Sequence, residues 1–116
     1  MMVTLLKSKI HNATVTSTNL QYEGSCAICP ILMDAANIRE YEQLHIYNIN
    51  NGERFTTYAI YSETPGIIDI RGSAARLAQI GDNIIICTYG LTVDTDPYDP
   101  IKVYVDNMNK LTTKGQ

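Results

Sequence analysis

The chain has 116 residues, of which 45% are hydrophobic and 18% are charged, and its net charge is −3. This length predicts a single domain spanning residues 1–116, and this composition excludes a largely disordered chain. The small negative charge excludes a general attraction to nucleic acid or anionic membranes, and no apolar run is long enough to cross a bilayer. We therefore expect a cytoplasmic protein that binds neither nucleic acid nor a membrane.

The three cysteines, Cys26, Cys29 and Cys87, argue against a disulfide framework, because their number is odd. Cys26 and Cys29 have the spacing of a redox pair, but such pairs usually lie at a helix N-terminus, and here Pro30 begins a helix only after both. A zinc site needs two further ligands, and the chain's two histidines have no matching spacing. We predict ordinary buried thiols and no metal site.

The first half of the chain predicts strands, one short helix and one tight turn. Residues 3–15 alternate loosely in polarity and predict one or two strands. Pro30 fits the first position of a short helix, PILMDAANI. The Asn-Asn-Gly sequence at 50–52 is a strong turn signal, so QLHIYNI and RFTTYAIYSE on either side should form a β-hairpin.

The second half predicts shorter strands separated by turns. Pro65-Gly66 marks a turn before a short strand, IIDI, and RGSAARLAQIGD contains a second short helical piece. NIIICTYGLTV is the most apolar run and predicts a central strand; DTDPYDP predicts a loop and IKVYV a last strand. The polar tail from about residue 107 should be mobile. Six to eight short strands with two short helices are typical of small barrels, and we predict a mainly β fold that closes into one.

A Gly24-Ser25 pair interrupts TNLQYEGSCAIC, a stretch that otherwise has the composition of a β-strand. Glycine has no side chain to pack, and serine competes for backbone hydrogen bonds, so both weaken a strand. The pair is therefore either a bulge or turn, or a place where an open carbonyl lies beside a hydroxyl for chemistry. Seen alone, a bulge in an edge strand is the simpler interpretation.

Five segments in this order, KSKIHNATVT, YEGSCAI, YNINNGERFTTYAI, GSAAR and IGDNIIICTY, resemble the pyruvoyl-dependent aspartate decarboxylases. The resemblance extends from about residue 4 to residue 89. It implies a small β-barrel of the double-psi type, a homotetramer and translation as an inactive precursor (a zymogen). It also implies a lyase that converts L-aspartate to β-alanine and CO2 for pantothenate biosynthesis. Maturation is either spontaneous or assisted by a maturation factor.

The resemblance also gives the Gly-Ser pair a chemical role. In this family the serine hydroxyl attacks the preceding glycine carbonyl, and the resulting ester is eliminated and hydrolysed to a pyruvoyl group. This implies autocatalytic cleavage between Gly24 and Ser25 into 1–24 and 25–116, with a covalently bound pyruvoyl group made from Ser25 as the cofactor. Its ketone forms a Schiff base with L-aspartate and accepts the electron pair released with CO2, without a metal or pyridoxal phosphate.

The resemblance assigns three polar side chains to proton transfer and substrate binding. Tyr58 returns the proton to the substrate, although the same residue in isolation is equally typical of packing on a barrel face. Arg54 and Lys9 bind carboxylates, for which bidentate guanidinium geometry is well suited; the alternative is two solvent-facing bases. An even spacing along a regular strand places Arg54 and Tyr58 on one face.

Four further positions follow from the same resemblance. Thr57 polarises the Gly24 carbonyl and lies near substrate, although a regular strand directs it away from Tyr58. Gly72, Ser73 and Ala74 offer backbone N–H groups to a carboxylate, and Ser73 is equally suited to cap the helix that begins there. His11 matches a residue near the site to which we assign no catalytic role.

Three positions depart from the family pattern, which usually has Asn at 71, Ala at 73 and Asp at 29. Arg71 adds a charge beside the site, and we expect it to pair with an acidic residue such as Asp69 or Glu53 rather than replace the amide. The expected consequence is slow self-cleavage. The alternative function is a non-catalytic small β-barrel binding module that has kept the scaffold.

Overall fold

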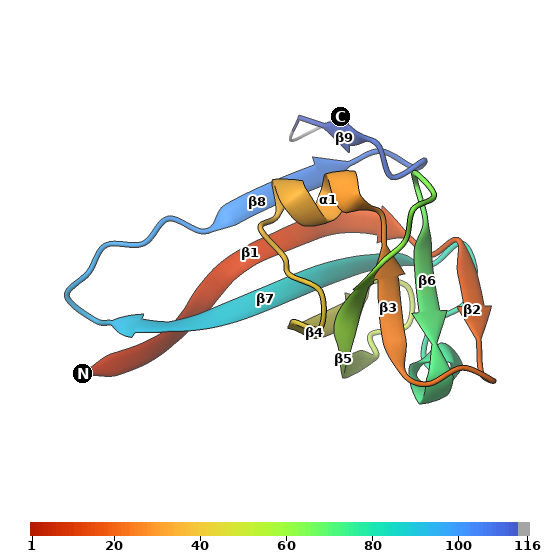
Figure 1. The fold of residues 1–116 in the computed structure, drawn as a ribbon, viewed down its shortest axis with the longest axis horizontal. Helices are drawn as coiled ribbons and strands as arrows, with labels where there is room; N and C mark the ends of the chain where they lie inside the picture. The colour runs from red at the N-terminus through yellow and green to blue at the C-terminus, as the bar shows by residue number, and fades with distance from the viewer. Residues whose placement is uncertain (114–116) are drawn as a thin grey trace.

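The computed structural model of the chain describes residues 1–113, and the last three residues of the expected tail lie outside this range. The fold is mainly β, as predicted from the sequence (Figure 1). In chain order the elements are β1 (Met2–Thr14), β2 (Ser17–Asn19), β3 (Ser25–Ile28), α1 (Pro30–Ala35), β4 (Gln43–Asn48), β5 (Arg54–Tyr61), β6 (Ile68–Arg71), the 3₁₀ helix η1 (Gly72–Arg76), β7 (Asn83–Val93), β8 (Ile101–Val105) and β9 (Leu111–Thr112).

The strands form one mixed sheet with the order β2-β6-β3-β5-β4-β7-β1-β8-β9. β7 lies between β4 and β1, which confirms the prediction that the most apolar run is an interior strand. The hairpin predicted from Asn-Asn-Gly is also confirmed, because β4 and β5 pair antiparallel from Gln43 opposite Tyr58 to Tyr47 opposite Arg54. Gly52 in the connecting turn has a φ of 76°, a conformation that favours glycine.

Two segments differ from the sequence prediction. The stretch at 18–29 is not one interrupted strand, because the chain leaves β2 after Asn19, turns, and re-enters the sheet as β3 at Ser25. The second helical piece is a 3₁₀ helix of five residues. Its N-cap is Arg71, with no capping hydrogen bond from a side chain, so the expectation that Ser73 caps this helix is wrong.

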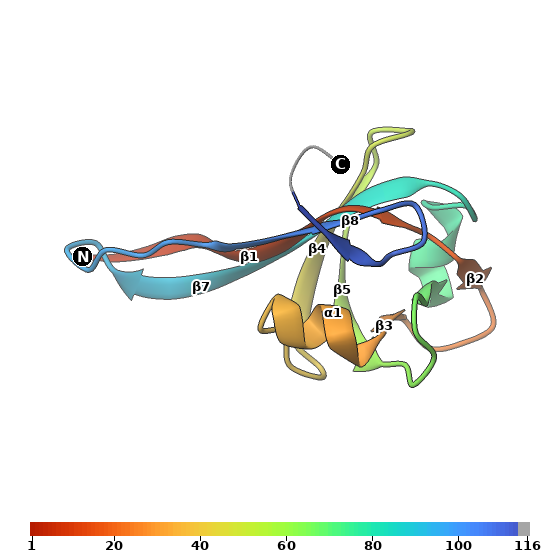
Figure 2. The ribbon, with the colours of Figure 1, turned by 90° about the horizontal axis from the view of Figure 1, so that it is seen from above.

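The long strands β1 and β7 extend beyond the rest of the sheet as a two-stranded ribbon that carries the N-terminus (Figures 1 and 2). Apolar side chains remain exposed along this ribbon, including Met2 at 52% and Leu91 at 65%. Near the sheet, β1 shifts its register between Ile10 and Ala13. The intervening Asn12 has a φ of 69°, a conformation in which asparagine is enriched.

The core lies on one face of the sheet and is built from aliphatic side chains of alternating strand positions. Ile10, Leu44, Ile46 and Ile86 are completely buried there. Leu32 and Met33 of α1 are equally buried, so this short helix covers part of the core. Within residues 1–113, no helix is long and apolar enough to cross a membrane.

The segment that joins β1 to β2 connects distant parts of the sheet. Val15 donates its N–H to the carbonyl of Asp82 and accepts a hydrogen bond from the N–H of Gly81. The N–H of Thr16 donates to the carbonyl of Ile68 at the start of β6. Directly after β1, the chain is thus bonded both to the residues before β7 and to the start of β6.

The side chain of Asn109, near the C-terminal end of the chain, hydrogen-bonds to the end of β1 and to the turn before β6. Its buried Oδ1 accepts the N–H of Thr14 at 2.7 Å, and its Nδ2 donates to the carbonyls of Thr14 and Gly66, both at 2.9 Å. The segment from about residue 107, for which the sequence predicts mobility, thus contributes a buried amide and strand β9. Its mobility stays a prediction.

We predict that Asn109→Ala lowers the free energy of unfolding by about 2–3 kcal/mol, because it leaves a buried N–H and two carbonyls without their partner. In a chain of this size the Tm should fall by roughly 10 °C. The measurement is thermal unfolding by circular dichroism. Asn107→Ala, at an exposed position in the same turn, is the control and should leave the Tm nearly unchanged; equal shifts in the two variants would contradict the role of Asn109.

Candidate active site

Ser25 is the first residue of β3, a strand that is buried on both faces between β5 and β6. The residue is only 1% exposed, and its hydroxyl oxygen has no hydrogen-bond partner within residues 1–113. A buried hydroxyl without a partner is uncommon in folded proteins, because desolvation is then uncompensated. The hydroxyl of Ser25 is therefore free to act as a nucleophile.

The strand register places polar side chains in a row beside Ser25. Arg71 of β6 lies directly opposite Ser25, and Asn19 of β2 lies opposite Arg71. On the other side, Cys26 pairs with Ala59 in a parallel ladder, so Ser25 is level with Tyr58. Side chains at the same level of neighbouring strands share a face. The register thus places Tyr58 and Ser25 on neighbouring strands, at one level and on one face.

Gly72 makes a close backbone approach to Gly24 at the residue before the nucleophile. It has a φ of 75°, and a Cβ built on it would lie 2.6 Å from Gly24 Cα and 2.7 Å from Gly24 N. No side chain fits at such distances, so only glycine permits this contact. Figure 1 shows the connection from β2 to β3 passing beside the helical turn that follows β6. The predicted cleavage site and the start of η1 are therefore one structural unit.

Arg71 pairs with an acidic residue, as predicted from the sequence, and the partner is Asp69. Its Nε donates to Asp69 Oδ2 at 2.8 Å, and its guanidinium carbon lies 5.1 Å from the centre of the Tyr22 ring. Asp69 is 9% exposed, and its second oxygen, Oδ1, has no hydrogen-bond partner within residues 1–113. The Arg71 side chain is thus paired with Asp69, two residues earlier on the same strand.

The three cysteines are free and buried, which confirms the prediction of ordinary thiols. Burial, with a further contribution from the charge of Asp69, raises the pKa of Cys26 to about 12. Burial also raises the pKa of Cys87, although Tyr89 and Lys9 oppose the shift. Neither thiol is a competing nucleophile, because the reactive form is the thiolate. No metal-binding cluster of histidine, cysteine or carboxylate side chains occurs within residues 1–113.

Thr57 lies on the face of β5 opposite to Tyr58, as expected for a regular strand. It is paired with Leu44, a completely buried core residue. The parallel register of β3 and β5, continued by one residue before Ser25, brings Gly24 level with Thr57. A contact between Thr57 and the Gly24 carbonyl therefore requires no distortion of β5.

Arg54 begins β5 and lies over an aromatic ring of the paired strand. Its guanidinium carbon is 4.5 Å from the centre of the Tyr47 ring, and the Tyr47 hydroxyl forms a 2.7 Å hydrogen bond with that of Tyr89. The ring of His45 meets Tyr89 edge-on at 5.0 Å. Sequence reasoning did not identify Tyr47, although the hairpin register set by Asn-Asn-Gly places it opposite Arg54.

Lys9 lies on β1, between Cys87 of β7 and Lys102 of β8. Burial lowers the pKa of His11, and the positive charge of Lys9 lowers it further. The Nδ1 atom of His11 is buried without a hydrogen-bond partner in the described part of the chain, and its ring packs edge-on against Tyr104. Lys9 and Arg54 make no ion pair within residues 1–113, so both cations are available to an anion.

The fold separates the predicted site residues into two groups. Gly24, Ser25, Tyr58 and the start of η1 lie together. Lys9 lies four strands from β3 in the sheet order, a path of roughly 19 Å at about 4.8 Å per strand. Arg54 lies four residues from Tyr58, or about 13 Å along β5. Counted along the sheet, the backbones of Lys9 and Arg54 are thus well separated from Ser25.

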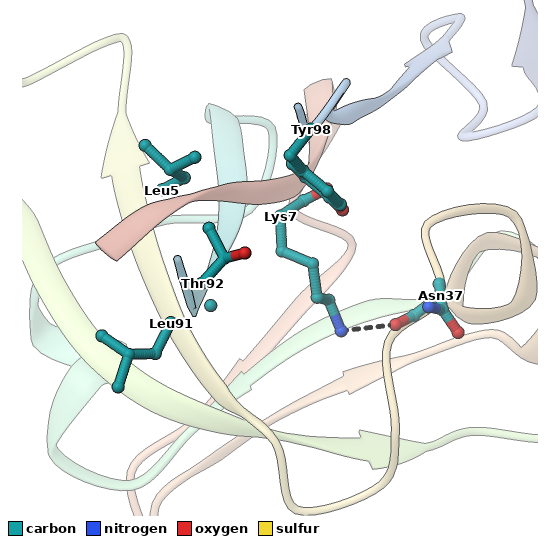
Figure 3. Close-up of a pocket in the computed structure, with 7 residues that line it drawn as sticks. Leu5, Lys7, Asn37, Leu91, Thr92 and Tyr98 are labelled. Carbon is teal, nitrogen blue, oxygen red and sulfur yellow. Dashed lines mark hydrogen bonds between the residues drawn. The ribbon is translucent and has the colours of Figure 1, made fainter. Parts of the chain in front are cut away.

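A cavity of about 340 Å³ lies at the base of the β1–β7 ribbon, away from these residues (Figure 3). Lys7 crosses it and donates to the carbonyl of Asn37 at 2.7 Å, and it forms an ion pair with Glu42 at 2.7 Å. Tyr98 from the loop after β7 donates to the carbonyl of Lys7 at 2.8 Å. The amine of Lys7 is thus occupied by structural contacts, whereas Lys9 makes no ion pair within residues 1–113.

Residues 1–112 match the model of a protein family described as aspartate decarboxylase. A protein named aspartate 1-decarboxylase from Nitrosococcus oceani is 52% identical over 99% of this chain and 94% of its own length. Proteins of the same name from Methylococcus capsulatus and Albidiferax ferrireducens are each 56% identical, over 97% and 96% of this chain and 91% and 84% of their own lengths.

The approach of Gly72 to Gly24 predicts that Gly72→Ala disrupts the site. The added methyl group overlaps the Gly24 backbone, so self-cleavage should slow at least about 10-fold and the Tm should fall. Gly52→Ala is a matched control, because Gly52 has nearly the same φ, 76°, and no atom within 4 Å of the added Cβ. It bears only the conformational cost of about 1–2 kcal/mol.

The measurement is the uncleaved fraction of the chain on a denaturing gel over time, together with thermal unfolding. Equal cleavage rates in the two glycine variants would contradict a specific role for the Gly72 contact.

Proposed function

The chain belongs to the aspartate decarboxylase family of carboxy-lyases, and we propose that it converts L-aspartate to β-alanine and CO2 after cleaving itself between Gly24 and Ser25. The observation that carries this proposal is the similarity to aspartate 1-decarboxylases over almost the whole chain. The buried, unpartnered hydroxyl of Ser25 beside the backbone contact of two glycines supports the cleavage step. β-Alanine would then serve the biosynthesis of pantothenate.

Self-cleavage starts with attack of the Ser25 hydroxyl on the Gly24 carbonyl carbon. Gly24 has no side chain to obstruct the attack, and Thr57, which is level with Gly24, would polarise its carbonyl. Elimination of the resulting ester releases residues 1–24. Hydrolysis of the new N-terminal residue of 25–116 gives a pyruvoyl group and ammonia. Because the chain supplies the reacting groups, the pyruvoyl group would be its only cofactor.

A pyruvoyl group at position 25 fits the surroundings of Ser25, which is buried, free of hydrogen-bond partners and level with Tyr58. This group supplies a ketone that binds the substrate amine and takes up the electron pair released with CO2. Tyr58 holds its hydroxyl proton beside the substrate and donates it to the α-carbon once CO2 has left. The ring of Tyr41 lies 6.4 Å from that of Tyr58.

Aspartate carries two carboxylates, which suits the two unpaired cations Lys9 and Arg54. We propose that these cations reach Ser25 from a neighbouring copy of the chain, because along the sheet the backbone of Arg54 lies about 13 Å from Tyr58 and that of Lys9 lies about 19 Å from β3. The exposed apolar side chains of the β1–β7 ribbon support association of copies. A homotetramer is the assembly that the family resemblance implies.

The N–H groups at the start of η1, from Gly72, Ser73 and Ala74, are proposed to bind a substrate carboxylate in the same site. Gly72 and Ala74 are buried and Ser73 is exposed, so this turn contacts both the Gly24 backbone and the surface. A maturation factor and a cytoplasmic location stay predictions from the sequence.

We further propose that the nine-stranded sheet closes into a small β-barrel of the double-psi type. The hydrogen bond from the Thr16 N–H to the Ile68 carbonyl of β6 supports this closure, and so does Asn109, which bonds to Thr14 at the end of β1 and to Gly66 shortly before β6. A non-catalytic binding module with the same scaffold would leave the free hydroxyl of Ser25 and the two unpaired cations without a use.

Ser25→Ala removes the nucleophile and the precursor of the ketone. We predict a folded chain that stays intact and forms no β-alanine from L-aspartate. Intact mass spectrometry and amino-acid analysis of the reaction provide the measurement. Ser62→Ala, half-buried just after β5, is the control and should cleave and turn over normally. Production of β-alanine by the Ser25 variant would refute the proposed function, and an uncleaved wild-type chain would favour a binding module.

Tyr58→Phe separates cleavage from turnover, because reprotonation happens only after the pyruvoyl group has formed. We predict normal self-cleavage and a decrease in kcat of about 10²–10⁴-fold. Tyr61→Phe is a matched control on the same strand, directed to the opposite face and 43% exposed. An unchanged kcat in the Tyr58 variant would mean that another group or water donates the proton.

A further inference from the structure

Asp69 carries a buried carboxylate oxygen that the fold leaves without a donor. Its Oδ2 accepts the hydrogen bond from Arg71, whereas Oδ1 has no hydrogen-bond partner within residues 1–113. The residue is only 9% exposed. A buried, unpartnered carboxylate oxygen is costly, because it has lost its water and gained no replacement. Such an oxygen is available to accept a proton from a nearby group.

The nearest candidate donor by strand register is Ser25. Arg71 is paired with Ser25 and Asp69 with Ala27 in the antiparallel ladder of β3 and β6. Residues two apart on a strand share a face, so Asp69 and Ser25 are diagonal neighbours on one face. Such neighbours lie roughly 7–8 Å apart at the backbone. The two side chains do not hydrogen-bond to each other in this structure, because Ser25 Oγ and Asp69 Oδ1 both lack a partner, so proton transfer requires a small side-chain movement or one bridging water.

We propose that Asp69 is the proton acceptor for Ser25 in self-cleavage, an inference that rests on the cleavage proposed above. The Ser25 O–H bond breaks as its proton passes to Asp69 Oδ1, and the released electron pair forms the bond from Oγ to the Gly24 carbonyl carbon. When this tetrahedral centre collapses, the C–N bond breaks and the Ser25 nitrogen takes the proton from Asp69. The products are an ester and a free amine, and the Asp69 carboxylate is regenerated.

The other ionisable groups near Ser25 are less suited to this task. Burial keeps Cys26 as a neutral thiol, because it raises the pKa to about 12. Arg71 is always charged and only donates hydrogen bonds. Glu23 is exposed on the connection before β3, so its carboxylate is solvated. Asp69 combines a buried free oxygen with a place on the same face as the nucleophile.

The test compares Asp69→Asn with Arg71→Asn, since both remove the same ion pair and only the first removes the acceptor. The uncleaved fraction is followed by intact mass spectrometry after cell-free synthesis of each full-length chain. Asp69→Asn should cleave at least about 100-fold more slowly than wild type. Arg71→Asn should cleave faster, because both Asp69 oxygens are then free of the guanidinium. Glu23→Gln controls for loss of a nearby carboxylate and should cleave at the wild-type rate.

Three results would overturn the proposal. Similar slowing in Asp69→Asn and Arg71→Asn would mean that only the ion pair matters. A wild-type rate in Asp69→Asn would show that the acceptor is elsewhere, and a faster rate would show that Asp69 acts by withholding Arg71 from the Gly24 carbonyl. Thermal unfolding of each variant verifies that the compared chains are folded.

Hydroxylamine identifies the step at which Asp69 acts, because it cleaves an accumulated ester and leaves a hydroxamate on Gly24. Asp69→Asn should accumulate no ester, so hydroxylamine should release no additional 1–24 fragment. Release of this fragment would place Asp69 in the later elimination and overturn the assignment. If Asp69→Asn does not fold, Asp69→Glu keeps the charge and displaces the carboxylate by one methylene; a wild-type rate in the folded glutamate variant also refutes the proposal.

The wild-type chain and Ser25→Ala distinguish this inference from the proposed function. If wild type does not cleave at Gly24–Ser25, the proposed function fails. If wild type cleaves and Asp69→Asn cleaves equally fast, the function stands and only the role of Asp69 fails.

Discussion

The site depends on one steric constraint, the contact between the backbones of Gly24 and Gly72. A Cβ at position 72 would lie 2.6 Å from Gly24 Cα, so the two chain segments approach more closely than any side chain permits. This contact joins the residue before β3 to the start of η1. It holds Gly24 and Ser25 beside the polar end of β6, and the Ser25 hydroxyl has no hydrogen-bond partner within residues 1–113. The same absence of hydrogen bonds leaves the Ser25 hydroxyl free to react.

Much of the fold could be predicted from sequence, because local signals and long-range structure agree in most segments. The bounds of β7 follow from an apolar run between two turn signals, and the β4–β5 hairpin follows from Asn-Asn-Gly. The break between β2 and β3 was not predictable in the same way, since the composition of 18–29 resembles one continuous strand. The hydrogen bonds of Asn109 were not predictable either, because its partners Thr14 and Gly66 are far away in sequence.

The candidate site could be predicted only where a motif or a strand register specifies it. The even spacing of Arg54 and Tyr58 predicts a shared face, and the register agrees. Spacing does not tell that the guanidinium of Arg54 rests on Tyr47, or that strand order separates Lys9 from Ser25. These facts depend on pairings between distant segments. The pairing of Arg71 with Asp69 was predictable, because residues two apart on a strand share a face.

The charges around the two groups of residues favour the proposal that a second copy of the chain completes the site. Beside Ser25, Arg71 is neutralised by Asp69, so apart from the N–H groups at the start of η1 this region offers no free positive charge to a dicarboxylate. The unpaired cations, Lys9 and Arg54, lie on strand positions that have no carboxylate partner within residues 1–113. Each group lacks what the other provides: the nucleophile lacks free positive charge, and the cations lack a nucleophile. Association of copies that places the cations of one chain against β3 of another satisfies both requirements.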